Sequence, residues 1–567
     1  MDAKFVLVCA LGLLVVFAGV APAGSIQYFD GGGTSTLSGS WDNLQTAITA
    51  AEGGGGAGWV KVSGDVTRTA GDTASHLSIA TGGISVSGGW DAGFGTQSGV
   101  SVLDADHDGL GGAVRVMDVA GSNTSLDRLG VTGGKSDRGA GVYAHGANSV
   151  TMTRLDVHGN DADGGWLYGG GGMTIHDCDG VTISHSDIHN NLTKNGRGYG
   201  GGLFLQDSGT EASPVIIEYS KIRENEALKG KYGGYGGGLF VRGGSSNTII
   251  ANSRIVDNVA QFGETAIGIA YPDDDGMTIV NTLITGNRGR EGEESGKSTI
   301  QFGGDEGYYW DGGNRVMVSG GRGLVLANST VVDNYDGSVD MEAGGSYQRW
   351  EQESFLAINS ILDDAYVKGG YGYNHGHSWQ HRAYLMFQNS TLNLSEDEAY
   401  GATDYDGAAV GTVWASDLIG ALALTDYHDY LRFHSLDATG AQTQDVEGNF
   451  ETAPAYVGAG EDPLDPYRLF AGAPSTDSGL TGDDLGGGFT YVDINTDGDY
   501  DAMVDIVVAG TDPGAGHLVY MTDLLGNARL VDTIDRGAYE SAAAPIPEPA
   551  GLSLLGLALL ALRRRRS

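Results

Sequence analysis

LDVHGN (155–160) is the first of six related phrases; the others are SDIHNN (186–191), SKIREN (220–225), SRIVDN (253–258), TLITGN (282–287) and STVVDN (329–334). Each copy places a β-branched residue three positions before an Asn. Successive Asn residues are separated by 31, 34, 33, 29 and 47 positions. A repeat of this length indicates a solenoid, in which each unit buries its apolar face only by stacking on its neighbours.

The repeating units have the pattern of strands. Apolar residues alternate in VTISHSDI (181–188) and VIIEYSKI (215–222), and Gly and Asn flank these segments. Several strands per repeat predict a parallel β-helix with Val, Ile and Leu in its bore. The recurring Asn would stack amide on amide and satisfy the backbone of the turns. This stretch resembles the right-handed β-helix of the pectate-lyase-like superfamily, which implies an architecture and not an activity.

Composition excludes several classes of protein. The chain has 567 residues with 97 Gly and 11 Pro but no G-X-Y period, which excludes collagen. Lys and Arg number 32 against 72 Asp and Glu, a net charge of −40. This charge argues against nucleic acid and anionic lipid as direct partners, and favours divalent cations or simple solubility. Its two cysteines are Cys9 and Cys178, and Cys9 lies in a segment that we expect to be removed, so no internal disulfide is predicted.

The N-terminus has the pattern of a secretory signal peptide, residues 1–23. Lys4 precedes an apolar run from residue 5 to about 20, and Ala21-Pro22-Ala23 provides a cleavage site after Ala23. An uncleaved anchor is the alternative. Residues 24–125 would form an N-terminal cap and the first coils.

Within this region SWDNLQTAITAA (40–51) predicts a short amphipathic helix capped by Ser40 or Asp42. Its apolar positions are Trp41, Leu44, Ala47, Ile48 and Ala51. We expect it to cover the open end of the first coil, because an exposed sheet edge invites pairing with other chains.

The C-terminus, residues 545–567, has three parts. Pro547-Glu548-Pro549 leads into an apolar run over 550–562, and Arg563, Arg564, Arg565 and Arg566 follow it. As a helix the apolar run would reach only ~20 Å, less than a hydrocarbon core of ~30 Å. The tail resembles the PEP-CTERM sorting signal. The resemblance implies transient inner-membrane anchoring, recognition by an exosortase, removal of the tail, and export to the cell surface or exopolysaccharide matrix of a Gram-negative bacterium.

Residues 126–447 are expected to form the β-helix, with irregular later coils, and the composition changes at 448–541. GNFETAPAYVG, YRLFAGAPSTDSG and TDLLGNARLVDTIDRGAYE occur there in order. Together they resemble the choice-of-anchor Q domain, with Asp535-Arg536-Gly537-Ala538 in place of the usual Asp-Ile-Gly-Ala. The resemblance implies a β-rich module for surface display.

An acidic loop in this module is a candidate Ca²⁺ site. Oxygen-bearing residues occupy every second position of this loop, and Gly498 stands at the sixth position, where a cation loop requires a sharp turn. The twelfth position is Val504 and not Glu. The pattern is therefore closer to a dockerin-like or thrombospondin-like loop, and a plain acidic turn is the alternative. The predicted ligands are Asp493, Asn495, Asp497, Asp499 and Asp501.

Other candidate residues form no diagnostic pattern. His375, His377 and His381 could ligate a metal or lie in an exposed polar loop. Tyrosines that recur at similar positions of the repeats could stack on sugar rings. The Gly runs at 169–172, 200–202 and 236–238 suit tight corners better than a phosphate site. The tyrosines are Tyr168, Tyr199, Tyr232 and Tyr235, and the scattered candidates for catalysis are Asp177, Asp187, Asp207 and Lys221.

Two functional hypotheses follow. The first is an exported, acidic, non-enzymatic β-helix, stabilised by Ca²⁺, with a role in adhesion or in an extracellular polysaccharide matrix. The second is a polysaccharide lyase or glycoside hydrolase working in a groove of the solenoid, which would need several acids and an Arg or Lys base on adjacent coils.

Overall fold

The computed structural model describes residues 24–290 with short gaps at 56–57, 107–109, 111–113, 164–168, 195–197, 211, 229–233, 244, 246, 262 and 271–276. It also describes 298–303, 324–334, residue 360 and the later strands given below. The predicted signal segment, the histidine-rich segment at 375–381, the acidic loop at 493–505 and the predicted sorting tail lie outside the described residues.

Four sheets form the walls of the solenoid, and we call them A, B, C and D. Sheet A contains, in spatial order, β2 (Thr34–Ser38), β1 (Ser25–Phe29), β3 (Gly58–Ser63), β6 (Ile84–Trp90), β9 (Ser125–Asp127), β13 (Thr151–Thr153), β17 (Thr182–Ser184), β21 (Val215–Glu218), β25 (Thr248–Ala251), β29 (Met277–Val280), β35 (Leu324–Ala327), β38 (Gln352–Ile358), β41 (Arg382–Gln388), β45 (Leu431–Leu436) and β46 (Gln442–Thr443). Sheet B contains β4 (Val66–Thr67), β7 (Ser101–Asp104), β10 (Leu129–Thr132), β14 (Asp156–His158), β18 (Asp187–His189), β22 (Lys221–Arg223), β26 (Arg254–Val256), β30 (Leu283–Thr285), β36 (Thr330–Val332), β39 (Ile361–Ala365) and β42 (Thr391–Leu394).

Sheet C contains β5 (Leu77–Ile79), β8 (Met117–Val119), β12 (Val142–His145), β16 (Met173–His176), β20 (Leu203–Gln206), β24 (Leu239–Arg242), β28 (Ile267–Ala270), β32 (Ile300–Gly303), β37 (Val339–Glu342) and β40 (Val367–Gly369). Sheet D is the narrowest and contains β11 (Lys135–Ser136), β15 (Asp161–Asp163), β19 (Leu192–Lys194), β23 (Glu226–Ala227), β27 (Val259–Ala260) and β31 (Arg288–Gly289).

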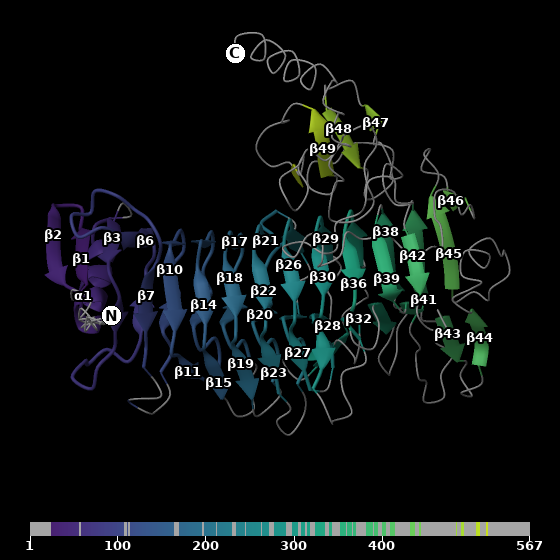
Figure 1. Ribbon diagram of the computed structural model, residues 1–567, viewed down its shortest axis with the longest axis horizontal. Helices are drawn as coiled ribbons and strands as arrows, with labels where there is room; N and C mark the ends of the chain where they lie inside the picture. Colours follow the sequence, from purple (N-terminus) through teal and green to yellow (C-terminus); the bar gives the residue numbers. More distant parts are fainter. Residues whose placement is uncertain are drawn as a thin grey trace, which may run out of the picture.

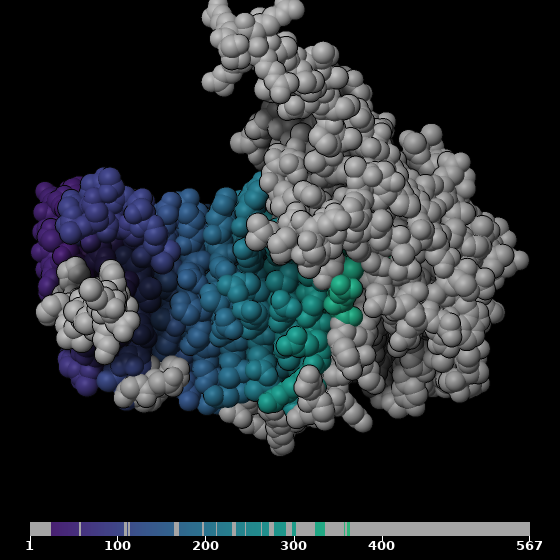
Figure 2. All heavy atoms as spheres, in the orientation of Figure 1, coloured from purple at the N-terminus to yellow at the C-terminus, as the bar shows by residue number. Residues whose placement is uncertain are grey.

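Each coil visits the sheets in the order C, A, B, D. The coil of β12, β13, β14 and β15 is followed by that of β16, β17, β18 and β19, and each strand pairs in parallel with its counterpart one coil later. Figure 1 shows these coils side by side along the long axis, and the space-filling view in Figure 2 shows the described coils as one continuous body. The predicted right-handed parallel β-helix is confirmed.

The recurring β-branched residues line the bore, as predicted. Side chains alternate between the two faces of a strand, so in each three-residue strand of sheet B the middle residue points inward and its two neighbours point outward. The inward residues of sheet B are at most 1% exposed: Val131, Val157, Ile188, Ile222, Ile255, Ile284 and Val331.

From β9 onward, each described change of direction between sheets A and B, and between B and D, uses a single residue in the left-handed conformation. At the second of these corners the residue before each recurring Asn has a positive φ: Gly159 (63°), Asn190 (52°), Glu224 (53°), Asp257 (55°), Gly286 (67°) and Asp333 (50°). Gly, Asn and Asp tolerate this conformation best, which explains why the phrases end in GN, NN or DN in all copies except SKIREN.

The asparagines form an uninterrupted ladder along the inside of this corner. Asn160, Asn191, Asn225, Asn258, Asn287 and Asn334 are all buried. The Oδ1 of Asn225 accepts hydrogen bonds from the backbone N of Asn191 at 3.1 Å and from its Nδ2 at 3.0 Å. The Nδ2 of Asn225 donates to the Asn258 Oδ1 at 3.0 Å and to the Ile188 carbonyl at 2.8 Å. The predicted structural role of the Asn residues is confirmed.

The Gly runs make room for this ladder. A Cβ atom on Gly202 would lie 2.7 Å from the Asn225 Nδ2, and one on Gly172 would lie 2.8 Å from the Asn191 Nδ2. Such separations are shorter than any van der Waals contact, so only Gly fits at these positions. The runs therefore serve packing, as the sequence predicted.

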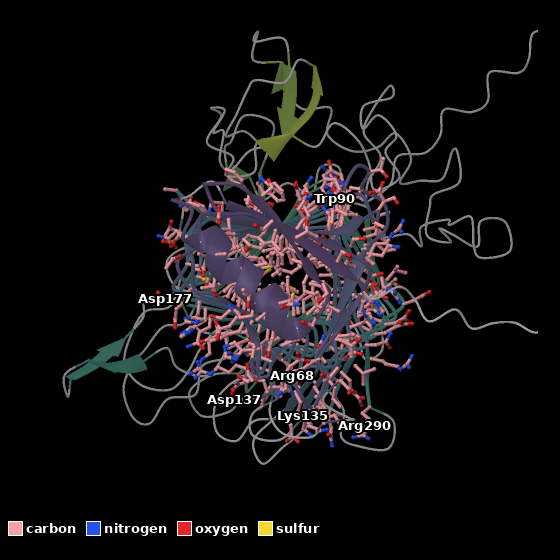
Figure 3. The ribbon with its side chains drawn as sticks, turned by 90° about the vertical axis from the view of Figure 1, so that its left-hand side faces the viewer. Arg68, Trp90, Lys135, Asp137, Asp177 and Arg290 are labelled. Carbon is pink, nitrogen blue, oxygen red and sulfur yellow. The ribbon has the colours of Figure 1, made fainter. Side chains whose placement is uncertain are left out.

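Helix α1 (Trp41–Glu52) closes the N-terminal end of the bore. The Ser40 Oγ caps it by accepting a hydrogen bond from the Asn43 N at 3.3 Å, and its five predicted apolar residues are fully buried. The Gln45 side chain bonds both the N and the O of Ser78 in edge strand β5, at 2.6 and 3.1 Å. Figure 3 shows α1 lying across the end of the solenoid. The helix thus covers a sheet edge that would otherwise be open.

Smaller elements complete the described strands. Two hairpins pair β33 (Tyr308–Asp311) with β34 (Asn314–Met317) and β43 (Tyr400–Thr403) with β44 (Ala409–Val413). A four-stranded sheet within the predicted C-terminal module comprises β47 (Asp483–Asp484), β48 (Phe489–Val492), β49 (Ile506–Gly510) and β50 (Leu518–Val519). In the part of the chain that the structure describes, no helix has the length and apolar character needed to cross a bilayer.

We predict that Asn225→Ala strongly destabilises the protein. The substitution removes the side-chain partners of the Asn191 N–H, the Asn191 amide and the Ile188 carbonyl. Each buried polar group left unpaired costs about 1–3 kcal/mol, so we expect the free energy of unfolding in urea to fall by roughly 3 kcal/mol or more.

The matched control is Asn190→Gly. Asn190 precedes Asn191 of the same ladder, but it is exposed and has φ of 52°, so Gly is compatible with its backbone. Loss of its exposed contacts with His189 and Glu224 should change stability by about 0.5 kcal/mol or less. Equal effects of the two substitutions would contradict a supporting role for the ladder.

Candidate functional site

The outer face of sheet B carries a cluster of titratable side chains on consecutive coils. In β14 and β18 the register pairs Asp156 with Asp187 and His158 with His189, and all four lie on the outward face because the intervening Val157 and Ile188 point into the bore. In the next strand, Lys221 and Arg223 occupy the same two columns. Along the solenoid axis, the outer face of sheet B therefore changes from carboxylates and imidazoles in β14 and β18 to Lys and Arg in β22.

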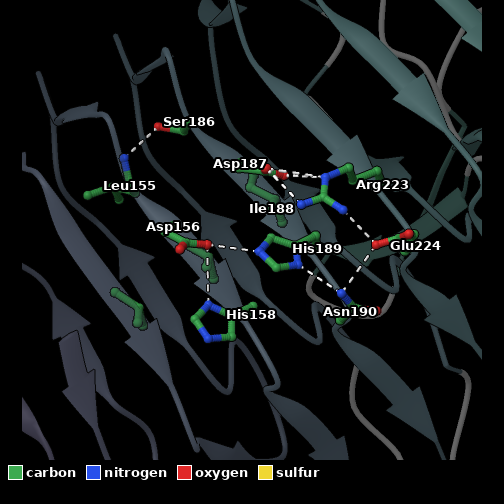
Figure 4. A network of polar contacts seen from close by, with 12 residues as sticks. Leu155, Asp156, His158, Ser186, Asp187, Ile188, His189, Asn190, Arg223 and Glu224 are labelled. Atoms are coloured by element: carbon green, nitrogen blue, oxygen red, sulfur yellow. Dashed lines mark hydrogen bonds and ion pairs between the residues drawn. The ribbon is translucent and has the colours of Figure 1, made fainter. Parts of the chain in front are cut away.

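Asp156, His158 and His189 converge on one another. The His189 Nε2 lies 2.9 Å from the Asp156 Oδ1, and the His158 Nδ1 lies 3.2 Å from the same oxygen. The two imidazole rings stack with their centroids 5.1 Å apart and their planes inclined by 10°. Figure 4 shows both rings beside the Asp156 carboxylate, which they approach from two adjacent coils.

The protonation of this cluster follows from its contacts. Contact with the imidazoles of His158 and His189 lowers the pKa of Asp156 well below its ordinary value. Contact with the Asp156 carboxylate raises the pKa of His158, although partial burial acts in the opposite direction. The carboxylate is therefore charged at neutral pH, and it favours a cation beside it, either a proton on an imidazole or another positive ion.

A second set of polar contacts adjoins the cluster. Arg223 forms two parallel hydrogen bonds to the Asp187 carboxylate, at 3.0 Å through both Nε and a terminal nitrogen, and a terminal nitrogen lies 2.6 Å from Glu224. The Asn190 Nδ2 lies 2.9 Å from the His189 Nδ1 and 3.3 Å from a Glu224 oxygen. One chain of contacts therefore leads from Asp187 through Arg223, Glu224 and Asn190 to His189 (Figure 4).

Another histidine cluster lies on the outer face of sheet C. Asp118 accepts a hydrogen bond from Arg115 at 2.8 Å and lies 2.9 Å from the His145 Nε2. Tyr143 stacks on His145 at 4.6 Å, and its hydroxyl lies 3.1 Å from the His176 Nδ1. Burial is the main cause that lowers the pKa of His176 below its ordinary value.

The scattered catalytic candidates do not come together. Asp187 and Lys221 are register partners on the outer face of sheet B. Asp177 and Asp207 instead occupy exposed left-handed corners between sheets C and A, with φ of 53° and 48°. The groove of acids that the enzymatic hypothesis requires is not formed by these four residues.

The aromatic candidates are packed partly against the protein itself. Tyr199 and Tyr235 are half-buried, and the Tyr199 ring stacks at 4.3 Å on Phe240, which is 4% exposed. Tyr168 and Tyr232 lie outside the described residues, as do the predicted Ca²⁺ ligands, the three candidate histidines and the sorting motif. The predictions for those residues stay predictions.

Cys178 has a structural environment. The Cys178 Sγ accepts a hydrogen bond from the Ala147 N at 3.4 Å, and the Cys178 N donates to the Ser208 Oγ. In the next coil, the Ser208 N donates to the Ser245 Oγ in the same way. The thiol therefore replaces a serine in a hydroxyl ladder. Burial raises its pKa to about 11, so it is protonated and unreactive at neutral pH.

The Asp156–His158–His189 cluster was missed by reasoning from the sequence, although a signal was present. LDVHGN and SDIHNN both contain Asp-x-His, and alternation along a strand places the Asp and the His on one face. The 31-residue step brings the two copies into register on adjacent coils.

One comparison with known proteins supports the fold. Residues 111–304, about a third of the chain, match the family model of the right handed beta helix region. A search of curated proteins gives no match. Among solved structures the chain is similar to the pectate lyase Pel9A, at 15% sequence identity over 74% of this chain and 84% of that chain. The TM-score is 0.30, so this likeness carries no argument.

For the sheet C cluster we predict that His176 makes the wild type less stable at acidic pH, and that His176→Gln does not show this loss of stability. A histidine whose folded-state pKa lies below its ordinary 6.5 takes up a proton more readily when unfolded, so stability falls as the pH drops through that value. Gln is compatible with the site because Gln206 is the register partner of His176 in the next coil.

The melting temperature of the variant minus that of the wild type should therefore rise as the pH is lowered from neutral towards 5, roughly through the ordinary histidine range. It should be constant on the alkaline side, where His176 is neutral in both states. A difference that is independent of pH throughout would show that His176 is protonated equally in the two states.

Proposed function

We infer that the protein is an exported, non-enzymatic structural element that acts in adhesion or matrix architecture at the cell surface or within an exopolysaccharide. The observation that carries this proposal is the pairing of outward charges between consecutive coils. Asp127 pairs with Arg154, Asp156 with His189, Asp161 with Lys194, and Asp187 with Arg223.

These pairs suit a rigid surface better than a catalytic groove. A general acid or base must be within reach of a substrate proton and hold a pKa suited to its task. On sheet B, Asp187 is engaged in two parallel hydrogen bonds from Arg223, and Asp156 is in contact with two imidazoles. Each such pair ties one coil to the next, and partly exposed pairs of this kind contribute modestly but repeatedly to stiffness.

The termini support export. The pattern of residues 1–23 is that of a secretory signal, and 545–567 resemble a tail that an exosortase recognises and removes. A net charge of −40 keeps such a rod soluble and disposes it to bind cations that bridge acidic polysaccharide. The polysaccharide partner and the surface location are therefore parts of one proposal.

The proposal predicts no turnover of polysaccharide. Incubation of the full chain with a panel of acidic polysaccharides should produce neither unsaturated products nor new reducing ends above the level of a heat-denatured control. Co-sedimentation with the same polysaccharides in the presence of Ca²⁺ should show binding. Release of unsaturated ends that is lost in Lys221→Ala would favour the lyase alternative instead.

We also propose that Ca²⁺ binds the loop of Asp493, Asn495, Asp497, Asp499 and Asp501 and stabilises the C-terminal module. Alternating oxygen ligands around Gly498 support this assignment, and extracellular Ca²⁺ is abundant enough to fill even a weak site of about 10⁻⁴–10⁻³ M.

Removal of Ca²⁺ with a chelator selective for it over Mg²⁺ should lower the melting temperature of the wild type. Asp497→Ala should show a much smaller response, because it lacks a ligand. Asp484→Ala, an acid of the same module outside the loop, is the matched control and should respond as the wild type does. An unchanged melting curve of the wild type would reduce the loop to an acidic turn.

A further inference from the structure

We propose that Asp156, His158 and His189 form a binding site for a transition-metal ion of the zinc class on the outer face of sheet B. One ligand atom from each residue lies within 4.8 Å of those of the other two. The site is distinct from the acidic loop proposed for Ca²⁺ and does not depend on the proposed function.

The separations of the ligand atoms suit a small ion. Tetrahedral Zn²⁺ holds nitrogen and oxygen ligands at about 2.0–2.2 Å, which places neighbouring ligand atoms roughly 3.3 Å apart. The Asp156 Oδ1 lies 2.9 Å from the His189 Nε2 and 3.2 Å from the His158 Nδ1. All three ligand atoms lie within 4.8 Å of one another, so rotation of the side chains is needed to bring them around one ion.

One ring nitrogen in the cluster lacks a satisfactory partner. The His158 Nδ1 is buried, and its contact with the Asp156 oxygen at 3.2 Å is an ion pair of the protonated ring that falls short of well-aligned hydrogen-bond geometry. Buried nitrogen atoms are rarely left unpaired in folded proteins. An ion between the carboxylate and the two rings would give this nitrogen a partner.

The chemistry of the three ligands selects the kind of ion. Two imidazoles and one carboxylate suit Zn²⁺, Cu²⁺, Ni²⁺ and Co²⁺, whereas Ca²⁺ and Mg²⁺ prefer sites built from oxygen. The side chains are partly exposed, at 39% for Asp156, 33% for His158 and 17% for His189, so an ion can enter from solvent and keep water in its open position.

Binding requires a defined adjustment of the rings. The lone pair of an imidazole nitrogen lies in the ring plane, and the two planes are only 10° from parallel, so at least one ring must turn about its χ2 bond. This torsion is broad and inexpensive to change. For Nε2 to bind the ion, the His189 proton must move to Nδ1, and the Asn190 amide, whose Nδ2 lies 2.9 Å from Nδ1, must turn so that its Oδ1 accepts that proton.

An ion at this position would act as a clamp between coils. Asp156 and His158 come from β14 and His189 comes from β18, so the ion would join two rungs that are otherwise connected by the backbone ladder and the Asn ladder. Binding to the folded state alone raises its stability by mass action.

The experiment titrates the full, chelator-treated chain with Co²⁺ and then with Zn²⁺. We expect a visible d–d absorption of low-symmetry Co²⁺ that saturates at one equivalent for this site, is displaced by Zn²⁺, and is accompanied by a higher melting temperature. In His158→Gln/His189→Gln the absorption should disappear and the apparent affinity for Zn²⁺ should fall roughly tenfold or more.

Two controls separate this site from other histidines among the 13 in the chain. His185→Asn removes an exposed histidine with φ of 52° on the preceding corner, where Asn fits, and should bind as the wild type does. A variant with Gln at 375, 377 and 381 should also retain the absorption.

Should the double variant fail to fold, Asp156→Asn keeps the size of the side chain and should show the same loss of affinity. An absence of Co²⁺ and Zn²⁺ binding in the wild type would overturn the proposal. So would full retention of binding in either the double variant or Asp156→Asn.

Discussion

The hydrogen bonds between stacked asparagines are the interaction on which the rest of the structure depends. A parallel β-helix must turn its chain inside every coil, and each turn brings backbone groups into the interior, where they need partners. In this protein the Asn side chain bonds to the Asn of the next coil and also to a carbonyl of the coil before, as Asn225 does with Asn258 and Ile188. The ladder therefore satisfies the corner and sets the register of the coils together.

That register determines what the surface presents. Because β14 and β18 are aligned residue by residue, the Asp-x-His pairs of two coils stand side by side, and the acid of one coil reaches the base of the next. The same diagonal contact recurs between Asp187 and Arg223. The outer polar contacts are thus a consequence of the inner ladder, and both tie each coil to its neighbour.

The fold was predictable because it depends on a repeated local pattern. The period, the inward β-branched residue and the buried Asn are all visible in the sequence, and the end-capping helix is visible in the spacing of Trp41, Leu44 and Ile48. These features need no knowledge of side-chain direction beyond the periods of a strand and a helix.

The cluster on sheet B was less accessible for two physical reasons. The outward positions of this cluster show no hydrophobic pattern in the sequence. Along the outer face of sheet B, these positions hold Asp and His in some coils and Lys, Arg or Leu in others. Its contacts are also diagonal, so they depend on rotamers as well as on register. Cys178 illustrates the same limit: it stands in a ladder with Ser208 and Ser245, at uneven steps of 30 and 37 residues that no single period would align.

The most direct test of this account is amide hydrogen exchange of the folded chain. Exchange from a cooperative core requires its opening, so the backbone amides of Asn191, Asn225 and Asn258 should exchange slowly and at similar rates, together with the inward strands of sheet B. Fast and unequal exchange of these amides, at the rates of exposed loop residues such as Gly33, would show that the asparagines do not hold the coils together.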